Sequence, residues 1–383
     1  MSNLVKVKDV IERVNTKEDR FNTDRLYYVG GEHFQSRALT VDDRGIIKGS
    51  TIGPMFYYGF KSNDFLLVSR NPHLRKAGLV NFDGICSEKT FVLHTKDERI
   101  LLQKFMPFIF QNERFWKYAI ANKHGSTNFF VNWSTLADYS FELPSIEQQK
   151  AISKLLWALN DTKKAYEDLI QKTDELVKSQ FIEMFGAVDY PCCKLSDECD
   201  LITKGTTPTT IGYDFTDEGI RFIKIENIDE KGRVNREGMS FISKDCNDVM
   251  KRSQLKNGDV LFSIAGAIGR CAIISQDLLP ANINQALAII RLKPSSMLKR
   301  EFLKASLHSD YVTKQYEDQK RGVAQLNLSL KNIGDLIIPV PPEEDQNTYI
   351  EFTHQSDKSK FELNEAIKDL DAMYKRIIKD NLS

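Results

Sequence analysis

Apolar residues recur at seven-residue intervals along two long stretches of the chain. In the first stretch, residues 146–185 contain neither glycine nor proline, so no residue there breaks a helix. The apolar positions that follow the repeat are Ile152, Leu155, Leu159, Tyr166, Leu169 and Leu176. Spacings of three and four residues place such side chains on one stripe of a helix, which is typical of a coiled-coil seam.

The second stretch, at the C-terminal end, keeps the same register when the numbering is shifted by 197. Its apolar positions are Tyr349, Phe352, Leu363, Leu370, Met373 and Ile377. Each stretch of about 40 residues predicts a helix of ~60 Å, at 1.5 Å per residue. One stripe could lie on its own domain, but two stripes in a shared register favour packing of the helices against each other. Polar residues that interrupt the stripes could set the register or accept another protein; they are Thr162, Thr173, Ser356 and Ser359.

The same shift aligns the segments that precede the two helices. Residues 125–149 read GSTNFFVNWSTLADYSFELPSIEQQ, and residues 322–346 read GVAQLNLSLKNIGDLIIPVPPEEDQ. The identical positions are Gly125 and Gly322, Asp138 and Asp335, Pro144 and Pro341, Glu147 and Glu344, and Gln149 and Gln346. Each copy predicts an extended apolar segment, a proline and then the acidic first turn of a helix. The chain is therefore a repeat of one globular segment followed by one long helix.

The globular segments mix short strand-like runs, turns and helical stretches, a pattern that predicts an α+β fold. Runs at 26–29 and 222–225 are strand-like, and helical stretches are expected near 101–122 and 298–320. We expect similar globular domains at 1–143 and 187–341, and long spacer helices at 144–186 and 342–383.

The composition is that of a globular protein and excludes several classes. The chain has 383 residues, of which 41% are hydrophobic and 28% charged, and its formal net charge is zero. This balance excludes a strongly basic architectural protein, although residues 1–143 carry a net charge of +4 and residues 342–383 one of −4. No apolar run approaches the ~18 residues of a membrane span, and the first residues lack the apolar core of a secretion signal. The six cysteines form no regular framework, so we expect free thiols in a reducing cytoplasm.

No arrangement of residues predicts a catalytic centre. The sequence contains no phosphate-binding loop and no methyltransferase motif, and its six histidines lack the spacing of metal ligands. Gly266 and Gly269 form half of a dinucleotide-binding motif, but apolar residues follow them, so a turn between two strands is favoured over a nucleotide site. We therefore expect a protein without catalytic residues, cofactor or metal.

Several short motifs, taken in order, resemble the specificity subunit of type I restriction–modification systems. In the second half, residues 204–208 (KGTTP) are similar to the Gly-x-Thr-Pro turn of that family, and residues 220–228 to the strand that follows it. Further similar segments are 258–263 with Gly266-x-x-Gly269, Asn284-Gln285, 322–329 and 338–346, and, in the first half, 143–149. The first half departs from the pattern because it lacks Gly-x-Thr-Pro near residue 16 and has Asn71-Pro72-His73 in place of Gly-x-x-Gly.

The resemblance implies a non-catalytic DNA-recognition subunit. Each globular domain would be a target recognition domain that reads one half of a bipartite site in double-stranded DNA. The two helices would pack antiparallel as a spacer between the domains. The spacer would dock modification (methyltransferase) subunits and, through them, restriction subunits. Because the two domains differ in sequence, the DNA target would be asymmetric.

Candidate DNA contacts follow from the chemistry of recognition. Bases are read by Arg, Lys, Asn and Gln on loops that enter a groove, whereas Lys, Arg, Ser and Thr bind phosphates. Residues of these types in or beside the motif turns of the second domain are Lys204, Thr206, Thr207, Lys224, Arg270, Asn284 and Gln325. Those of the first domain are Arg70, His73, Arg75, Lys76, Lys123 and Asn128. For each of them, a solvated surface position is the alternative.

Two other functions remain open from the sequence. The chain could be the detached specificity half of a single-chain (type IIG-like) restriction–methylation enzyme, in which case the catalytic motifs lie elsewhere. It could also be a coiled-coil scaffold without a role on DNA. A sequence-dependent shift of DNA in the presence of the partner would exclude the scaffold.

Overall fold

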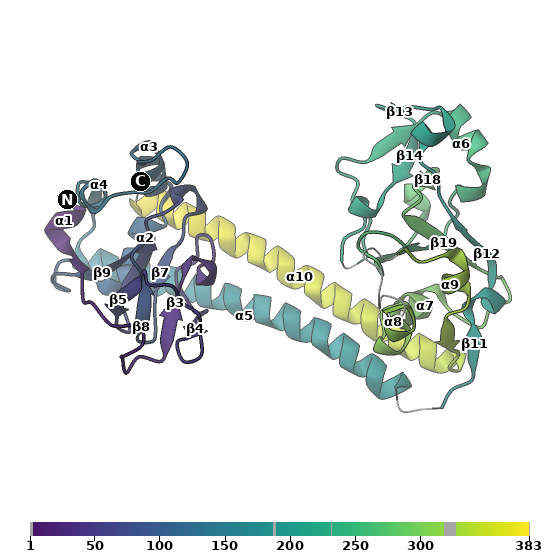
Figure 1. Cartoon of the computed structure of the whole chain (residues 1–383), viewed down its shortest axis with the longest axis horizontal. Coiled ribbons are helices and arrows are strands. Elements are labelled where there is room, and N and C mark those ends of the chain that lie inside the picture. The colour runs from purple at the N-terminus through teal and green to yellow at the C-terminus, as the bar shows by residue number, and fades with distance from the viewer. Residues whose placement is uncertain (1–2, 187–188, 231, 318–326, 383) are drawn as a thin grey trace. The chain divides into compact units, whose positions relative to one another are not determined.

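The chain folds into two compact units, each of which contains part of both long helices. The computed structural model describes residues 3–186, 189–230, 232–317 and 327–382. Unit 1 comprises Met1–Asp168 and Leu363–Ser383, and unit 2 comprises Leu169–Glu362. The long helices are α5 (Ile146–Phe185) and α10 (Glu343–Leu382), each of 40 residues (Figure 1). The two long helices expected from the seven-residue repeat are thus confirmed.

Unit 1 contains two four-stranded sheets and a two-stranded ribbon. The first sheet has the antiparallel order β2–β9–β6–β7, with strands at Ile11–Val14, Thr90–Thr95, Phe65–Val68 and Ala77–Leu79. The second has the order β4–β3–β8–β5, with strands at Gly45–Ile46, Tyr27–Val29, Gly84–Ser87 and Phe56–Phe60. The ribbon pairs β1 (Asn3–Lys6) with β10 (Ser140–Leu143). The short helices are α1 (Val7–Val10), α2 (Met106–Phe110), α3 (Glu113–Ala121) and α4 (Trp133–Ala137).

Unit 2 repeats this plan. Its first sheet has the order β12–β19–β16–β17, with strands at Cys199–Lys204, Leu287–Leu292, Val260–Ser263 and Cys271–Ile273. Its second has the order β13–β15–β14–β18, with strands at Phe215–Thr216, Ser240–Ile242, Ile220–Ile223 and Ala281–Ile283. The ribbon pairs β11 (Cys192–Lys194) with β20 (Ile337–Pro339). The short helices are α6 (Lys244–Val249), α7 (Arg300–Leu307), α8 (Asp310–Glu317) and α9 (Leu330–Gly334).

The matching order of the first sheets confirms the α+β fold with an internal repeat. The second sheets also share one parallel pair, β3 with β8 in unit 1 and β14 with β18 in unit 2. They differ at their edges, because β5 pairs with β8 in unit 1, whereas β13 pairs with β15 in unit 2. The turn expected at Gly266–Gly269 is confirmed, since it joins the antiparallel strands β16 and β17.

A buried glutamine fixes the start of each long helix in the same way. The amide of Gln149 donates to the carbonyls of Ile100 and Pro144, and its oxygen accepts from the backbone of Leu102. The equivalent Gln346 donates to Met297 and Pro341 and accepts from Lys299, with all three distances at 2.9 Å. Gln149 and Gln346 are 0% and 1% exposed, so these bonds satisfy polar groups that have no access to water.

Within each unit the two long helices pack antiparallel. In unit 2, Asp174 on α5 pairs with Lys360 on α10 at 2.7 Å, and further along α5 the ring of Phe181 lies 5.3 Å from that of Tyr349. In unit 1, Lys163 on α5 pairs with Asp371 on α10 at 2.7 Å. The residue numbers of α10 therefore fall as those of α5 rise, as an antiparallel spacer requires.

Of the two seven-residue series predicted for the seam, one is shielded from solvent. Its members are buried or partly buried: Ile152, Leu159, Tyr166, Tyr349, Leu363, Leu370 and Ile377. The other series was wrong at four positions, because Leu155, Leu169, Leu176 and Met373 are 46–53% exposed. Phe352 of that series is partly buried.

The seam instead uses the residues one position later, among them Leu156, Ile170, Val177 and Tyr374, which are buried or partly buried. Positions three and four residues ahead both neighbour a given side chain on a helix. In this structure the residue four positions ahead is buried or partly buried and the residue three positions ahead is exposed. The spacing of apolar residues alone does not reveal that choice.

Candidate nucleic-acid interface

Four turns of unit 2 carry the family motifs, and the structure brings them together. The turn after β12 contains Gly205, where a Cβ atom would collide with the carbonyl oxygen of Ile283 at the end of β18. Glycine is therefore required for the close approach of these two backbones. Beside it, the Thr207 hydroxyl donates to the side-chain oxygen of Gln285. The turn at 204–208 thus rests on the turn at 283–286.

The turn after β14 joins the same group. The backbone N–H of Asn284 donates to Ile223 at 3.3 Å, and Arg270 Nη1 donates to the Ile228 carbonyl at 3.0 Å. Lys224 opens this turn, and its ammonium lies 4.5 Å from the ring centroid of Phe215. Six of the seven candidates of the second domain therefore lie on these adjoining turns: Lys204, Thr206, Thr207, Lys224, Arg270 and Asn284. Gln325 lies outside the described residues.

Asn284 carries an unsatisfied polar atom at the centre of this group. Its side-chain oxygen is buried and has no hydrogen-bond partner in the part of the chain that the structure describes. Leaving a buried acceptor unpaired costs about 1–3 kcal/mol. This oxygen has no exposed surface, so a ligand reaches it only if the side chain turns outward; an asparagine that does so can pair bidentately with adenine.

In unit 1, four candidates lie on two adjoining segments. The backbone of Asn71 donates to Phe129 at 2.8 Å, and that of Val131 donates to Ser69 at 2.9 Å. The Lys123 ammonium lies 4.0 Å from the ring centroid of Phe129. The candidates on these segments, all exposed, are Arg70, His73, Lys123 and Asn128.

The side chains of Arg75 and Lys76 are engaged within unit 1. Arg75 Nη1 contacts Glu113 at 2.6 Å, and the Lys76 ammonium donates to the Gly31 carbonyl at 2.7 Å. Arg37 binds the same Glu113 carboxylate at 2.5 Å. The structure therefore gives these two candidates internal partners, which were not foreseen because both partners are far away in the sequence.

Where the first half departs from the Gly-x-x-Gly motif, its turn still contains two residues with left-handed φ, although they are four positions apart instead of three. Gly266 and Gly269 have φ of +71° and +95° between β16 and β17. Between the equivalent strands β6 and β7, Asn71 and Arg75 also have left-handed φ, of 52° and 53°. Asparagine tolerates this conformation better than most residues, whereas arginine is strained in it.

Arg44 is a further basic residue on a turn, and it was not among the predicted DNA contacts. It is exposed, and its guanidinium lies 4.2 Å from the Tyr27 ring centroid and 4.5 Å from that of Phe82. An arginine held on aromatic faces in this way keeps its donors available for phosphate. Its position in a polar turn before a glycine was the available signal.

Equivalent buried carboxylates hold the loops before β6 and β16. Asp64 and Asp259 accept the backbone N–H of Lys61 and Lys256, respectively, both at 2.7 Å. Asp259 also accepts two bonds from Arg291, each of 2.7 Å, and these bonds raise the pKa of that guanidinium. In unit 1 the arginine is replaced by His94, whose Nδ1 lies 2.9 Å from Asp64.

Burial makes several of the thiols unreactive. All six cysteines lie in the described ranges and are free. Burial raises the pKa of Cys86 and Cys271 strongly, and raises that of Cys193 to about 11 and that of Cys199 to about 12. These thiols are therefore protonated at neutral pH and poorly nucleophilic. Among the described residues, no three His, Cys, Asp or Glu side chains are grouped as a metal site requires.

The sequence matches a known protein family along most of its length. The type I restriction modification DNA specificity domain matches the chain twice, at residues 2–173 and 188–370. The chain belongs to the type I restriction–modification DNA specificity family. A member of that family, the EcoBI specificity subunit of Escherichia coli, is 24% identical over 354 residues, which cover 82% of this chain and 71% of that subunit.

Two solved structures have the same fold as the present chain. A chain from a structure on complex assembly and conformational transition of the type I R-M system is 18% identical, with a TM-score of 0.62; the match covers 99% of this chain and 96% of that one. The S subunit of a type I system from M. genitalium is 13% identical, with a TM-score of 0.60 and coverage of 100% and 96%. Across the described residues, no helix has the length and apolar character needed to cross a bilayer.

Proposed function

We propose that this chain reads the DNA target of a type I restriction–modification complex, with one half of a bipartite, asymmetric site read by each globular domain. The two target recognition domains are residues 1–143 and 187–341. The duplicated fold carries the proposal, because the turn between equivalent strands holds a basic side chain in both units, Arg70 after β6 and Arg270 before β17. Two such sites with different residues suit a target whose halves differ in sequence.

The long helices act as the spacer in this proposal. Half-sites can be read together only at a separation that matches the distance and helical phase between the two readers. Helices of 40 residues without glycine or proline give a stiff element for that purpose. The exposed leucines on α5, left out of the seam, give modification subunits an apolar surface to bind.

Catalysis belongs to the partners in this scheme. Adenine methylation requires the base to leave the duplex and enter a methyltransferase pocket, and the modification subunits supply that pocket. Restriction subunits bound through them would cut the DNA. The complex works in the cytoplasm, where the DNA and the partners are.

A binding experiment with the assembled complex tests this function. The chain is co-expressed with a type I modification subunit, and the purified complex is mixed with a pool of random duplexes for selection and sequencing. We expect enrichment of one sequence with two short blocks separated by a fixed number of unspecified pairs. Enrichment of a single continuous block, or of no sequence, would contradict the proposal. The second outcome is the one that a scaffold without a DNA role predicts.

A further inference from the structure

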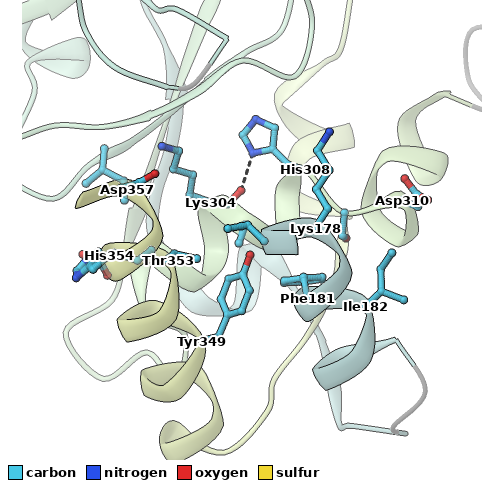
Figure 2. Close-up of a pocket in the computed structure, with 15 residues that line it drawn as sticks. Lys178, Phe181, Ile182, Lys304, His308, Asp310, Tyr349, Thr353, His354 and Asp357 are labelled. Carbon is cyan, nitrogen blue, oxygen red and sulfur yellow. Dashed lines mark hydrogen bonds between the residues drawn. The ribbon is translucent and has the colours of Figure 1, made fainter. Parts of the chain in front are cut away.

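Unit 2 contains a pocket of about 520 Å³ between the two long helices and the helix α7. Figure 2 shows Phe181 and Ile182 on α5 and Tyr349 on α10 at one side, with Lys304 and His308 opposite them. The rings of Phe181 and Tyr349 lie 5.3 Å apart, edge to face. His308 Nδ1 donates to the Lys304 carbonyl at 2.8 Å (Figure 2). The pocket therefore has an aromatic wall and a polar rim.

The internal repeat shows which side chains would fill this space. Shifting the numbering by 197 relates four pocket residues of unit 2 to larger, apolar residues of unit 1. The pairs are Ala305 with Phe108, Thr353 with Leu156, His354 with Trp157, and Val177 with Tyr374. The register of the comparison is secured by Gln149 and Gln346, which bind equivalent carbonyls in both units.

In unit 1 these larger residues fill the equivalent space. Phe108 and Leu156 are both 0% exposed. The ring of Trp157 lies 5.6 Å from that of Phe108, and its Nε1–H donates to the Lys104 carbonyl at 2.9 Å. Burial also raises the pKa of Tyr374. Three aromatic rings thus stand where unit 2 has alanine, histidine and valine.

Unit 1 does have hollows of its own near these residues. One of about 100 Å³ lies beside Asn160 and Tyr374, and one of about 410 Å³ is lined by Ser153, Lys154 and Trp157, among others. Since Phe108 and Leu156 are completely covered, neither hollow opens between them. Phe181 and Tyr349 of unit 2 are larger than their unit 1 equivalents, Ile378 and Ile152, but each of the other four pairs loses volume in unit 2. The difference between the units is therefore a net loss of side-chain volume in unit 2, at a place where the surrounding backbone is repeated.

We propose that the pocket of unit 2 receives an aromatic side chain of indole size from another polypeptide. Unit 1 provides the template, because there the chain fills the equivalent space with its own aromatic side chains. An aromatic anchor in a desolvated pocket with a polar rim is the usual form of a binding hot spot. The rim carries Lys178 and Lys304 as well as Glu301, Asp310 and Asp357, so charges of both signs surround the anchor.

This docking site is independent of the proposed reading of DNA. The partner would bind unit 2 by this pocket, whereas in unit 1 the equivalent place is filled by the buried side chains of Phe108 and Leu156. A polypeptide that binds both units through the repeated surfaces would therefore bind them unequally. DNA selection and anchor binding are measured separately, so failure of one does not decide the other.

The experiment measures the binding of a probe, N-acetyl-L-tryptophanamide, to the full chain by saturation-transfer NMR. Ala305→Phe and Thr353→Leu copy unit 1 into unit 2 and should each weaken probe binding about tenfold, while raising the melting temperature because they fill a cavity. Phe108→Leu, in the buried core of unit 1, is the matched control and should leave probe binding unchanged. The raised melting temperature shows that the pocket variants are folded.

Equal probe binding by the wild type and both pocket variants would overturn the proposal. Binding of free indole together with failure of the blocked tryptophan would also overturn it, because a small molecule would then be the occupant. The two variants differ in position, one on α7 and one on α10, so misfolding of either leaves the other as the test.

Discussion

The Lys360 ammonium on α10 contacts the Asp174 carboxylate on α5 at 2.7 Å. The same contact occurs in unit 1, since Lys163 and Asp371 are the residues 197 positions away and also lie 2.7 Å apart. The Lys360 side chain is 14% exposed and also contacts Asp357 at 2.7 Å, whereas that of Lys163 is 34% exposed. The internal repeat therefore includes the ion pairs of the spacer, with the more buried copy in unit 2.

Replacing Lys360 by methionine should lower the free energy of unfolding of unit 2 by about 1 kcal/mol, because the carboxylates lose their partner but remain partly hydrated. Lys163→Met is the matched control and should cost less, since its ion pair is more exposed. Urea denaturation of both variants measures the difference. A larger loss of unfolding free energy for Lys163→Met than for Lys360→Met would contradict the conclusion that the more buried ion pair stabilises the chain more.

The contribution of Lys360 should also depend on pH. Burial lowers the pKa of Lys360, but the hydrogen bonds and charges of Asp174 and Asp357 outweigh burial and raise it above the usual 10.5. The folded chain thus holds this proton more tightly than the unfolded chain. The stabilisation is complete below the unfolded pKa and is lost as the pH rises through the folded pKa. The difference between wild type and Lys360→Met should be constant around neutral pH and shrink above about pH 10.5. An increase of the difference in alkali would contradict this sign.

Gln346, at the start of α10, should contribute far more to the stability of unit 2 than its exposed neighbour Asn347. Gln346→Leu leaves the carbonyls of Met297 and Pro341 and the N–H of Lys299 without their partner. We expect a loss of about 3 kcal/mol in the free energy of unfolding of unit 2. Asn347→Ala, at an exposed position one residue later, should change it by less than about 0.5 kcal/mol. Similar effects of the two changes in urea denaturation would show that the buried bonds do not stabilise the helix start.

Loss of the buried Asp259 carboxylate should destabilise the chain more than loss of the buried Asp64 carboxylate. Asp259→Asn leaves the Arg291 guanidinium charged and without its carboxylate, which should cost about 3–5 kcal/mol. Asp64→Asn should cost less, because the His94 side chain is 40% exposed and a neutral imidazole can still bond to an amide. Thermal unfolding of both variants, compared at one pH, measures the order. Equal costs would contradict the role of the arginine.

The basic candidates of unit 1 should act on the salt dependence of DNA binding. If Arg70 and Lys123 bind phosphates, alanine at either position weakens binding about equally on all sequences and lowers the slope of log K against log salt by about 0.9. Arg99→Ala removes the same charge at a position where the arginine is 90% exposed and paired with Asp97, and it should leave the slope unchanged. Titration of the assembled complex at several salt concentrations checks this. Identical slopes for all three variants would exclude phosphate contacts at Arg70 and Lys123.

The repeat and the long helices could be predicted because they depend on local signals. A run without glycine or proline and a seven-residue period define a helix regardless of what surrounds it. The choice between Leu155 and Leu156 could not be predicted, because both neighbour Ile152 on a helix and the partner helix decides which is buried. The left-handed Arg75 was also unforeseeable, since the type of residue opposes the conformation that the strands impose.

The candidate site was predictable at the level of turns and not at the level of side chains. Glycines and motif order placed Lys224, Arg270 and Asn284 on turns that the fold brings together. Long-range contacts decide which of these side chains remain available. Arg270 bonds to the backbone of a neighbouring turn, and Arg75 bonds to Glu113. Neither partner has a signal in the sequence.

Methylome sequencing tests the reading of a bipartite site most directly. Cells that carry the gene, cells that lack it and cells with Asn284→Ala are compared for methylated adenines. We predict that deletion removes the mark from one split motif, and that Asn284→Ala relaxes or lowers methylation according to only one half of that motif. If no split adenine motif loses its mark on deletion, the chain does not specify the target of a methyltransferase.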